Sequence, residues 1–248
     1  SKLLSKKTLF KLLHFKTIQN GPSEIGTLFL HPDYRQYGLG RLLSLGRFLY
    51  MALFPHRFKP ITIAEMRGVS DDTGHSPFWE SLGRRFFEMD FTQADFLVSK
   101  NKEIIADLMH KHPIYVRLLS EPAQSVIGQP HQLTRPALKL LYSEGFKNTT
   151  HVDIFDAGPK VEVKTKNIRT IRNCKPYTIT DICDELYTDP SWFISNHSDK
   201  DFKVCLSSII KHRKHEVAIP HSIAQLLNVM PSDTIKACAV SHNNGGPI

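Results

Sequence analysis

The sequence has only four cysteines among its 248 residues, and it contains no long apolar run. The cysteines are widely spaced and form no CxxC pair, so neither a disulfide framework nor a cysteine-based metal site is expected: Cys174, Cys183, Cys205 and Cys238. No apolar stretch approaches the roughly 18 residues that a membrane-spanning helix needs. With 41% hydrophobic and 23% charged residues, the composition is that of an ordinary globular protein, and we interpret the chain as cytoplasmic with reduced cysteines.

The positive charge of the chain is not arranged as in a nucleic-acid-binding protein. Lysine and arginine give a formal net charge of +8, but they are dispersed, with small clusters only at residues 2–16 and 211–214. Aromatic residues do not alternate with either cluster, and no binding motif accompanies them. We therefore expect neither nucleic acid nor a membrane as a partner, whereas an anionic small molecule or a solvated surface both fit the charge. The 13 histidines form no set with zinc-ligand spacing, so no metal site is expected.

The stretch from Thr27 to Phe54 carries the clearest pattern, TLFLHPDYRQYGLGRLLSLGRFLYMALF. It predicts a strand over Glu24–Leu30, a break at His31-Pro32-Asp33, a glycine turn over Arg35–Gly40 and a helix over Arg41–Phe54. Apolar residues recur in the helix at spacings of three and four, which places them on one buried face: Leu42, Leu45, Leu49 and Leu53.

A glycine turn that leads into a helix leaves several backbone N–H groups pointing in one direction. Such a turn binds anions and is suited to a pyrophosphate. An ordinary strand-to-helix connection has the same local pattern, so the turn alone leaves both interpretations open.

The longer pattern Arg/Gln-x-x-Gly-x-Gly/Ala is the coenzyme A pyrophosphate loop of the GNAT acyltransferase superfamily, and Arg35–Gly40 resembles it at every fixed position. Four further motifs resemble those of the arginine N-succinyltransferase family and occur in the same order: AEMRGVSDDTGHSPFWESLGRRFFEMDF (Ala64–Phe91), KHPIY (Lys111–Tyr115), VIGQPH (Val126–His131) and DIFDAGP (Asp153–Pro159). The resemblance extends from about Ser1 to Arg172.

The resemblance implies an α+β, GNAT-like acyltransferase fold, in which helices flank a mixed sheet. A helix–Gly–Phe rhythm occurs twice, in SPFWESLGRRFF and PALKLLYSEGF, and indicates two acyltransferase-like lobes. We expect an acyltransferase region over residues 1–172, an irregular linker over 173–201 and a small β-rich unit over 202–248. Family members carry a long segment before the loop strand, where this chain has only Ser1–Ser23, so we expect the region to be N-terminally incomplete.

The activity that the resemblance implies is transfer of succinyl from succinyl-CoA to the α-amine of L-arginine. This reaction is the first step of arginine catabolism by the succinylation pathway. Direct attack by the amine suffices, so succinyl-CoA is expected as a co-substrate and no permanently bound cofactor is expected. We also expect a homo- or hetero-oligomer.

The coenzyme-binding residues that the resemblance implies lie in the strand and the glycine turn. Leu28 matches a succinyl-CoA-binding position, where the contact is made by the main chain. The turn contributes Arg35, Gly38, Gly40 and Arg41, because glycine lets the backbone approach a phosphate closely and arginine adds charged donors.

His131 matches the family position that is assigned as proton donor, and an imidazole exchanges protons readily near neutral pH. A histidine after proline is also a common turn residue, which is the alternative interpretation. The arginine guanidinium requires carboxylates, and the succinyl carboxylate requires a cation. The substrate-binding candidates are Glu65, Arg67, Asp71, Asp72 and Glu80, with Asp90, Arg84 and Arg85 as further carboxylate and cation candidates.

Two alternatives remain open from the sequence. One is another GNAT-type N-acyltransferase with a different acyl group or amine. The other is a truncated, non-catalytic partner or regulatory subunit, which the β-rich C-terminal unit would fit because small β-barrel modules often bind macromolecules.

Overall fold

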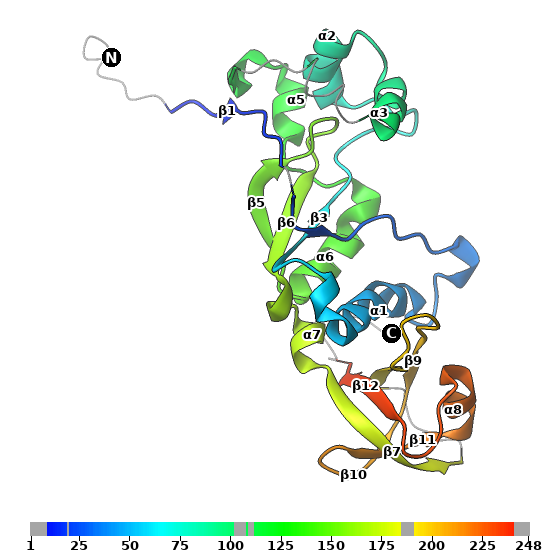
Figure 1. Cartoon of the computed structure of the whole chain (residues 1–248). Helices are drawn as coiled ribbons and strands as arrows, with labels where there is room; N and C mark the ends of the chain where they lie inside the picture. The colour runs from blue at the N-terminus through cyan, green and yellow to red at the C-terminus, as the bar shows by residue number, and fades with distance from the viewer. Residues whose placement is uncertain (1–8, 19, 102–107, 109–111, 185–190, 241–248) are drawn as a thin grey trace. The chain divides into compact units, whose positions relative to one another are not determined.

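The computed structural model describes residues 9–18, 20–101, 108, 112–184 and 191–240 (Figure 1). The chain divides into two compact units. Unit 1 comprises Ser1–Ile25, Ile63–Tyr142 and Lys147–Glu162, and unit 2 comprises Gly26–Thr62, Ser143–Phe146 and Val163–Ile248. The predicted α+β class is confirmed, with mixed sheets, flanking helices and a β-rich C-terminal part.

A four-stranded sheet has the order β2-β3-β6-β5. Its strands are β2 (Ser23–Glu24), β3 (Ile61–Glu65), β6 (Pro159–Lys164) and β5 (Lys147–Val152). β6 alternates buried and less buried residues, as expected of a strand with one face on the core. β3 consists of the run ITIAE, buries its three central residues and lies beside β2.

Unit 1 also contains a ribbon of β1 (Leu12–Leu13) and β4 (Ile114–Tyr115) and several short helices. These are a π-helical turn (Trp79–Gly83), α2 (Arg84–Phe87), α3 (Phe91–Lys100), α5 (Glu121–Val126) and α6 (Arg135–Ser143). Trp79 is fully buried and stacks on Phe155, with the ring centroids 5.4 Å apart. A Cβ on Gly83 would lie 2.1 Å from the Trp79 ring, so only glycine fits there. The helical turn runs through Gly83 directly into α2.

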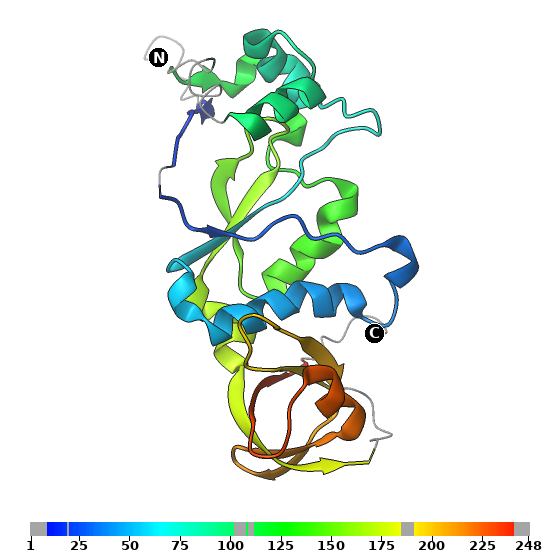
Figure 2. The ribbon, with the colours of Figure 1, turned by 45° about the vertical axis from the view of Figure 1, so that its right-hand side comes forward.

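Unit 2 contains α1 (Leu39–Leu53), α7 (Arg169–Asn173) and a six-stranded sheet of order β10-β11-β7-β12-β8-β9 that also carries α8 (His221–Leu227). The strands are β7 (Lys175–Cys183), β8 (Trp192–Ser195), β9 (Val204–Ser207), β10 (Ile210–Arg213), β11 (Glu216–Pro220) and β12 (Thr234–Ala239). The sheet curls around its core, as Figure 2 shows.

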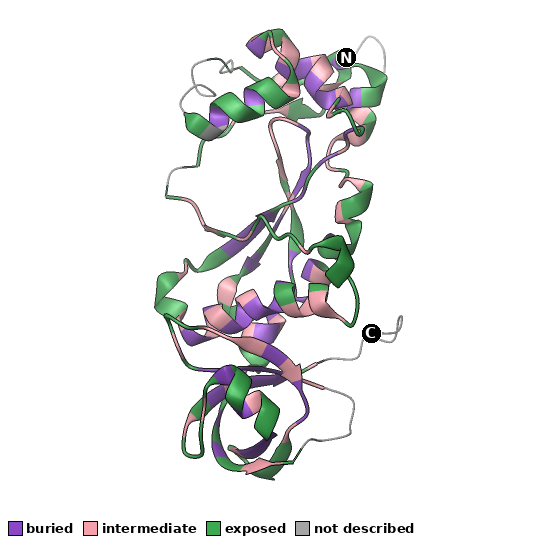
Figure 3. Cartoon of the chain, turned by 90° about the vertical axis from the view of Figure 1, so that its right-hand side faces the viewer, coloured by how far each residue is buried: buried purple, intermediate pink, exposed green. Residues whose placement is uncertain are grey.

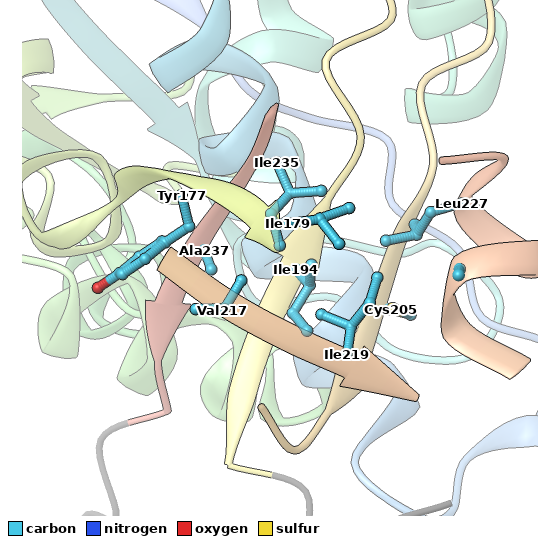
Figure 4. Close-up of a cluster of buried hydrophobic side chains, with 10 residues drawn as sticks. Tyr177, Ile179, Ile194, Cys205, Val217, Ile219, Leu227, Ile235 and Ala237 are labelled. Carbon is cyan, nitrogen blue, oxygen red and sulfur yellow. The ribbon is translucent and has the colours of Figure 1, made fainter. Parts of the chain in front are cut away.

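The core of this sheet is aliphatic. Side chains from five strands and α8 converge on it, including fully buried Ile179, Ile194, Ile219 and Leu227 (Figure 4). One side of α8 packs on this core and the other is exposed (Figure 3). Three of the four cysteines are buried free thiols, and burial raises the pKa of Cys174 to about 11 and those of Cys205 and Cys238 to about 12.

Two elements differ from the sequence-based expectation. Of the predicted strand Glu24–Leu30 only Glu24 lies in a strand, the end of β2, because Thr27 adopts a positive φ of 47° and turns the backbone out of the extended conformation. The segment 173–201, expected to be an irregular linker, contains β7 and β8, which form part of the same sheet as β9–β12. β7 pairs only with β11 and β12, which lie far away in the sequence, so local pattern did not reveal it, whereas β8 also pairs with nearby β9.

Candidate active site

The glycine turn begins a helix as predicted, two residues earlier than expected. Tyr37 and Gly38 both adopt positive φ values, 51° and 73°, and α1 starts at Leu39. Leu39 N donates to Gln36 O (3.1 Å), and Leu42 N makes the first α-helical bond, to Gly38 O (3.0 Å). The N–H groups of a first helical turn have no acceptor within the helix and carry the positive end of its dipole, so this terminus can hold an anion.

The two arginines of the turn differ in their surroundings. The Arg35 Nε group donates to Leu30 O (3.1 Å), which folds the preceding segment back over the turn. Arg41 is half-buried, and its pKa is lowered first by burial and then by Arg169, while Glu144 raises it. Arg41 and Arg169 also line a small cavity of about 20 Å³.

Glu144 is the fully buried carboxylate of this cluster. Its Oε1 accepts hydrogen bonds from Arg169 Nε (3.1 Å) and a terminal guanidinium nitrogen of Arg169 (2.7 Å), and its Oε2 accepts one from Thr170 N (2.8 Å). The carboxylate thus balances positive charge next to the helix that carries the turn.

Gly40 allows a direct test of the turn. A Cβ there would make only an ordinary contact, 3.6 Å from Leu30 Cδ2, so the fold has room for a side chain. We expect Gly40→Val to reduce CoA affinity at least tenfold, about 1.4 kcal/mol, because a branched side chain beside the first-turn N–H groups keeps phosphate away. Calorimetric titration with CoA measures this, and a thermal melt close to wild type serves as the control. Unchanged affinity in the folded variant would rule out the turn as the coenzyme site.

Leu28, expected to bind succinyl-CoA through its main chain, lies in the non-strand segment after Thr27. Its side chain is 44% exposed, and that of neighbouring Phe29 is 72% exposed. Exposed apolar residues beside the turn offer a surface for the apolar part of a ligand.

His131 lies in unit 1, at the end of the loop from Gly128. It precedes the 3₁₀ turn Gln132–Thr134, and its Nδ1 accepts a hydrogen bond from Leu133 N (3.2 Å). Its backbone N donates to Arg67 O (2.8 Å). A neutral imidazole whose Nδ1 accepts a bond carries its proton on Nε2, and this tautomer is inferred from the hydrogen-bond geometry. The half-buried ring can therefore donate a hydrogen bond from Nε2–H.

The structure brings Arg67 and His131 together through that backbone bond, and an Arg67 terminal guanidinium nitrogen donates to the buried Ser70 Oγ (2.7 Å). Thr134 Oγ1 lies 3.5 Å from Arg67 O and 2.9 Å from His131 O. Arg67 is thus the cation candidate with a defined relation to His131.

The candidate carboxylates already have protein partners in most cases. Glu80 accepts two hydrogen bonds from Arg84 (2.5 and 3.0 Å), and Arg84 also binds Asp90. Glu65 pairs with Lys160, and both belong to strands of the same sheet.

Asp71 is also engaged, in a local turn. It accepts hydrogen bonds from Thr73 Oγ1 (2.7 Å) and His75 N (2.8 Å), and the bond from Thr73, followed by that from His75, lowers its pKa. Asp72 beside it is exposed.

The two carboxyl groups of the motif DIFDAGP were not among the residues predicted for the site. Asp153 Oδ1 accepts hydrogen bonds from Phe155 N (2.7 Å) and Asp156 N (3.1 Å). Burial first, and the charge of Asp156 second, raise the pKa of Asp153 to about 6. Their positions within one of the resemblance motifs were the signal available in the sequence.

The raised pKa of Asp153 predicts a pH-dependent stability. The pKa of Asp153 is about 3.9 in the unfolded chain and about 6 in the folded protein, so between these values the folded protein holds a proton that the unfolded chain has lost. The resulting stabilisation is fully present below the unfolded pKa and is lost as the pH rises through about 6. We expect Asp153→Asn, which resembles the protonated acid, to unfold at a similar urea concentration to wild type near pH 4. Near pH 7 the variant should be more stable by about 1–3 kcal/mol. Urea titrations at both pH values measure the difference, and a constant difference across this range would contradict the assignment.

Among the described residues, no three His, Cys, Asp or Glu side chains are grouped so that they could hold a metal ion. Within that same part of the chain, no helix combines the length and apolar character that crossing a membrane would require.

Comparison with known proteins identifies the family. The family model described as arginine N-succinyltransferase beta subunit (AstA) matches residues 1–170. The chain belongs to this family, and the resemblance inferred from the motifs is confirmed.

The arginine N-succinyltransferase of Enterobacter sp. (strain 638) is 45% identical over 207 residues, which is 83% of this chain and 60% of that protein. The protein of the same name from an Escherichia coli O139:H28 strain is 44% identical over 208 residues, 84% of this chain and 60% of its own length. The solved structure of arginine/ornithine succinyltransferase subunit AI from Pseudomonas aeruginosa matches with a TM-score of 0.83 at 29% identity. That match covers 97% of this chain and 69% of the Pseudomonas chain. The chain thus spans about 60% of the length of these curated relatives.

Proposed function

We propose that this chain belongs to an enzyme that transfers succinyl from succinyl-CoA to the α-amine of L-arginine, the first step of arginine catabolism by succinylation. The observation that carries the proposal is the family match over residues 1–170. The relatives that bear the name arginine N-succinyltransferase at about 45% identity support it.

In this proposal the glycine turn binds the pyrophosphate of succinyl-CoA. Gly38, with its positive φ, and Gly40 let the backbone approach the phosphates, and the first turn of α1 directs its N–H groups and dipole at them. Arg35 and Arg41 add positive charge. Leu28 contributes main-chain groups to the pantetheine arm.

The chemical step is a direct attack by the neutral α-amine on the thioester carbonyl. The amine nitrogen forms a bond to the carbonyl carbon, the carbon–sulfur bond breaks, and the amine loses a proton to water. His131 donates a hydrogen bond from Nε2–H to the departing thiolate, because its Nδ1 accepts from Leu133 N. It passes that proton to the sulfur as Nε2 takes up the proton that the amine has given to water, so the ring ends neutral. The step requires no covalent enzyme intermediate.

The substrate charges require partners of opposite sign. Arg67 is proposed for the succinyl carboxylate because its peptide group contacts the His131 backbone. Glu65, Asp71, Asp72 and Glu80 are proposed for the arginine guanidinium. Of these, the exposed Asp72 is favoured, since Glu80 is bound by Arg84 on both oxygens, Asp71 fills its own turn and Glu65 pairs with Lys160.

We also propose that the protein works in the cytoplasm as an oligomer. The four cysteines are free thiols in the structure, which fits a reducing compartment. The names "beta subunit" and "subunit AI" of the family and the Pseudomonas protein support an assembly.

The test measures thiol release from succinyl-CoA with L-arginine, and compares acetyl-CoA and L-lysine at equal concentrations. We expect release to be fast only with succinyl-CoA and arginine. Equal turnover of acetyl-CoA would favour another GNAT-type acyltransferase. A folded protein that binds CoA but releases no thiol would favour the non-catalytic subunit.

A further inference from the structure

Two segments of unit 1, one containing Gly68 and the other Gly158, cross so closely that neither position has room for a side chain. A Cβ on Gly68 would lie 2.3 Å from Asp156 O, and one on Gly158 would lie 2.0 Å from Met66 O. The Asp156 side chain bridges this crossing. Its Oδ2 accepts from Gly68 N (2.7 Å) and its Oδ1 from Gly158 N (2.8 Å), and the residue is only 6% exposed.

The carbonyl groups of the same two peptide units bind the loop that ends at His131. In the Arg67–Gly68 peptide, the N–H donates to Asp156 and the C=O accepts from His131 N (2.8 Å). In the Ala157–Gly158 peptide, the N–H donates to Asp156 and the C=O accepts from Gly128 N (2.8 Å). One carboxylate therefore orients two peptide planes, and each plane holds one end of the loop.

A planar peptide group couples the hydrogen bond that its N–H donates to the one that its C=O accepts, through its rigid geometry and through its polarisation. Because N–H and C=O lie in one rigid plane, a shift of the N–H partner rotates the carbonyl as well. A charged acceptor on the N–H also polarises the group and strengthens the bond that its carbonyl accepts. The orientation of both loop ends thus depends on Asp156.

We propose that Asp156 is a positioning residue that fixes the His131 imidazole through these two peptide planes. Its kinetic consequence rests on the proposed function, whereas its effect on the ring does not. Asp156→Asn replaces one acceptor oxygen by an NH₂ group that faces an N–H, so one plane is released. A misplacement of this kind costs up to about 10²-fold in rate.

The experiment measures kcat, KM for succinyl-CoA, and the ¹⁵N signals of the His131 ring in Asp156→Asn, with the ring signals assigned from their loss in His131→Asn. We expect kcat to fall by roughly 10- to 100-fold with KM for succinyl-CoA near wild type, and the Nδ1 signal to shift or broaden. Asp153→Asn is the matched control, because it makes the same change three residues away in a side chain that bonds Phe155 N and Asp156 N but neither Gly68 N nor Gly158 N. It should leave kcat and the His131 signals as in wild type.

The proposal would be overturned if Asp156→Asn kept the wild-type ring signals and kcat. It would also be overturned if Asp153→Asn changed the ring signals and kcat as much as Asp156→Asn does. If wild type shows no succinyl transfer but the His131 signals still change only in Asp156→Asn, the positioning role stands and the proposed function fails. Should Asp156→Asn not fold, Asp156→Ser serves instead, since its single hydroxyl oxygen can keep the local bond from Gly158 N but not also the bond from Gly68 N. A ring shift with reduced kcat supports the proposal, and no change in either contradicts it.

Discussion

A His131→Asn variant is expected to lose about 10²–10⁴-fold in kcat, the usual range for removal of a positioned general acid. Asparagine is a favoured residue before a helical turn and can accept the Leu133 N–H bond that Nδ1 now accepts. The turn should therefore survive while the proton donor is lost. KM should change little, because the proton is delivered mainly in the transition state. Steady-state kinetics on the folded variant measure both parameters.

The control for this variant is His151→Gln, a histidine of the same unit on strand β5, whose kcat should match wild type. A melt and a kcat for His131→Asn both close to wild type would remove His131 from the mechanism. The proton-transfer role would then pass to Glu65 or to an ordered water.

Replacement of Glu144 should produce the largest loss of stability. Glu144→Gln is expected to lower the free energy of unfolding by about 3–5 kcal/mol, because it leaves the Arg169 charge without its buried counter-ion. Arg41 increases the cost, since its charge then repels Arg169 without compensation. Urea unfolding followed by circular dichroism measures the loss.

Glu162→Gln, an exposed glutamate of β6, is the matched control and should stay within about 0.5 kcal/mol of wild type. The double variant Glu144→Leu with Arg169→Met should recover part of the loss, because both members of the ion pair are removed together, while Thr170 N still loses its acceptor. A Glu144→Gln protein as stable as the control would show that the pair contributes nothing.

The sequence predicted best where periodicity and local turns decide the structure. α1 buries Leu45, Leu49 and Leu53 as its leucine spacing indicated, although Leu42 is only half-buried, and the C-terminal part is β-rich as expected. The prediction of a strand over Glu24–Leu30 was wrong. Thr27 adopts a positive φ, and the sequence of apolar and polar residues does not show which residue takes this conformation.

The environment of the candidate site could be predicted only in part. The motifs located the glycine turn and His131, but the partners of the charged residues come from distant segments. Lys160 of β6 pairs with Glu65 of β3. Arg84 binds the carboxylate of Glu80 because the helical backbone continues through Gly83 and places the two side chains on the same side. Such pairings depend on how strands and helices pack, so composition and spacing could not assign them.

The buried thiols of unit 2 have a practical consequence for enzymology. Cys174, Cys205 and Cys238 are protonated at any working pH and are shielded by the sheet, so a chromogenic disulfide reagent reacts with them only when the sheet opens. In the folded protein, the colour that develops after mixing with succinyl-CoA will report released CoA and, at most, the half-buried Cys183. In a parallel sample without substrate, the same reagent reports the rate at which the C-terminal sheet opens. The two samples together therefore separate turnover from denaturation.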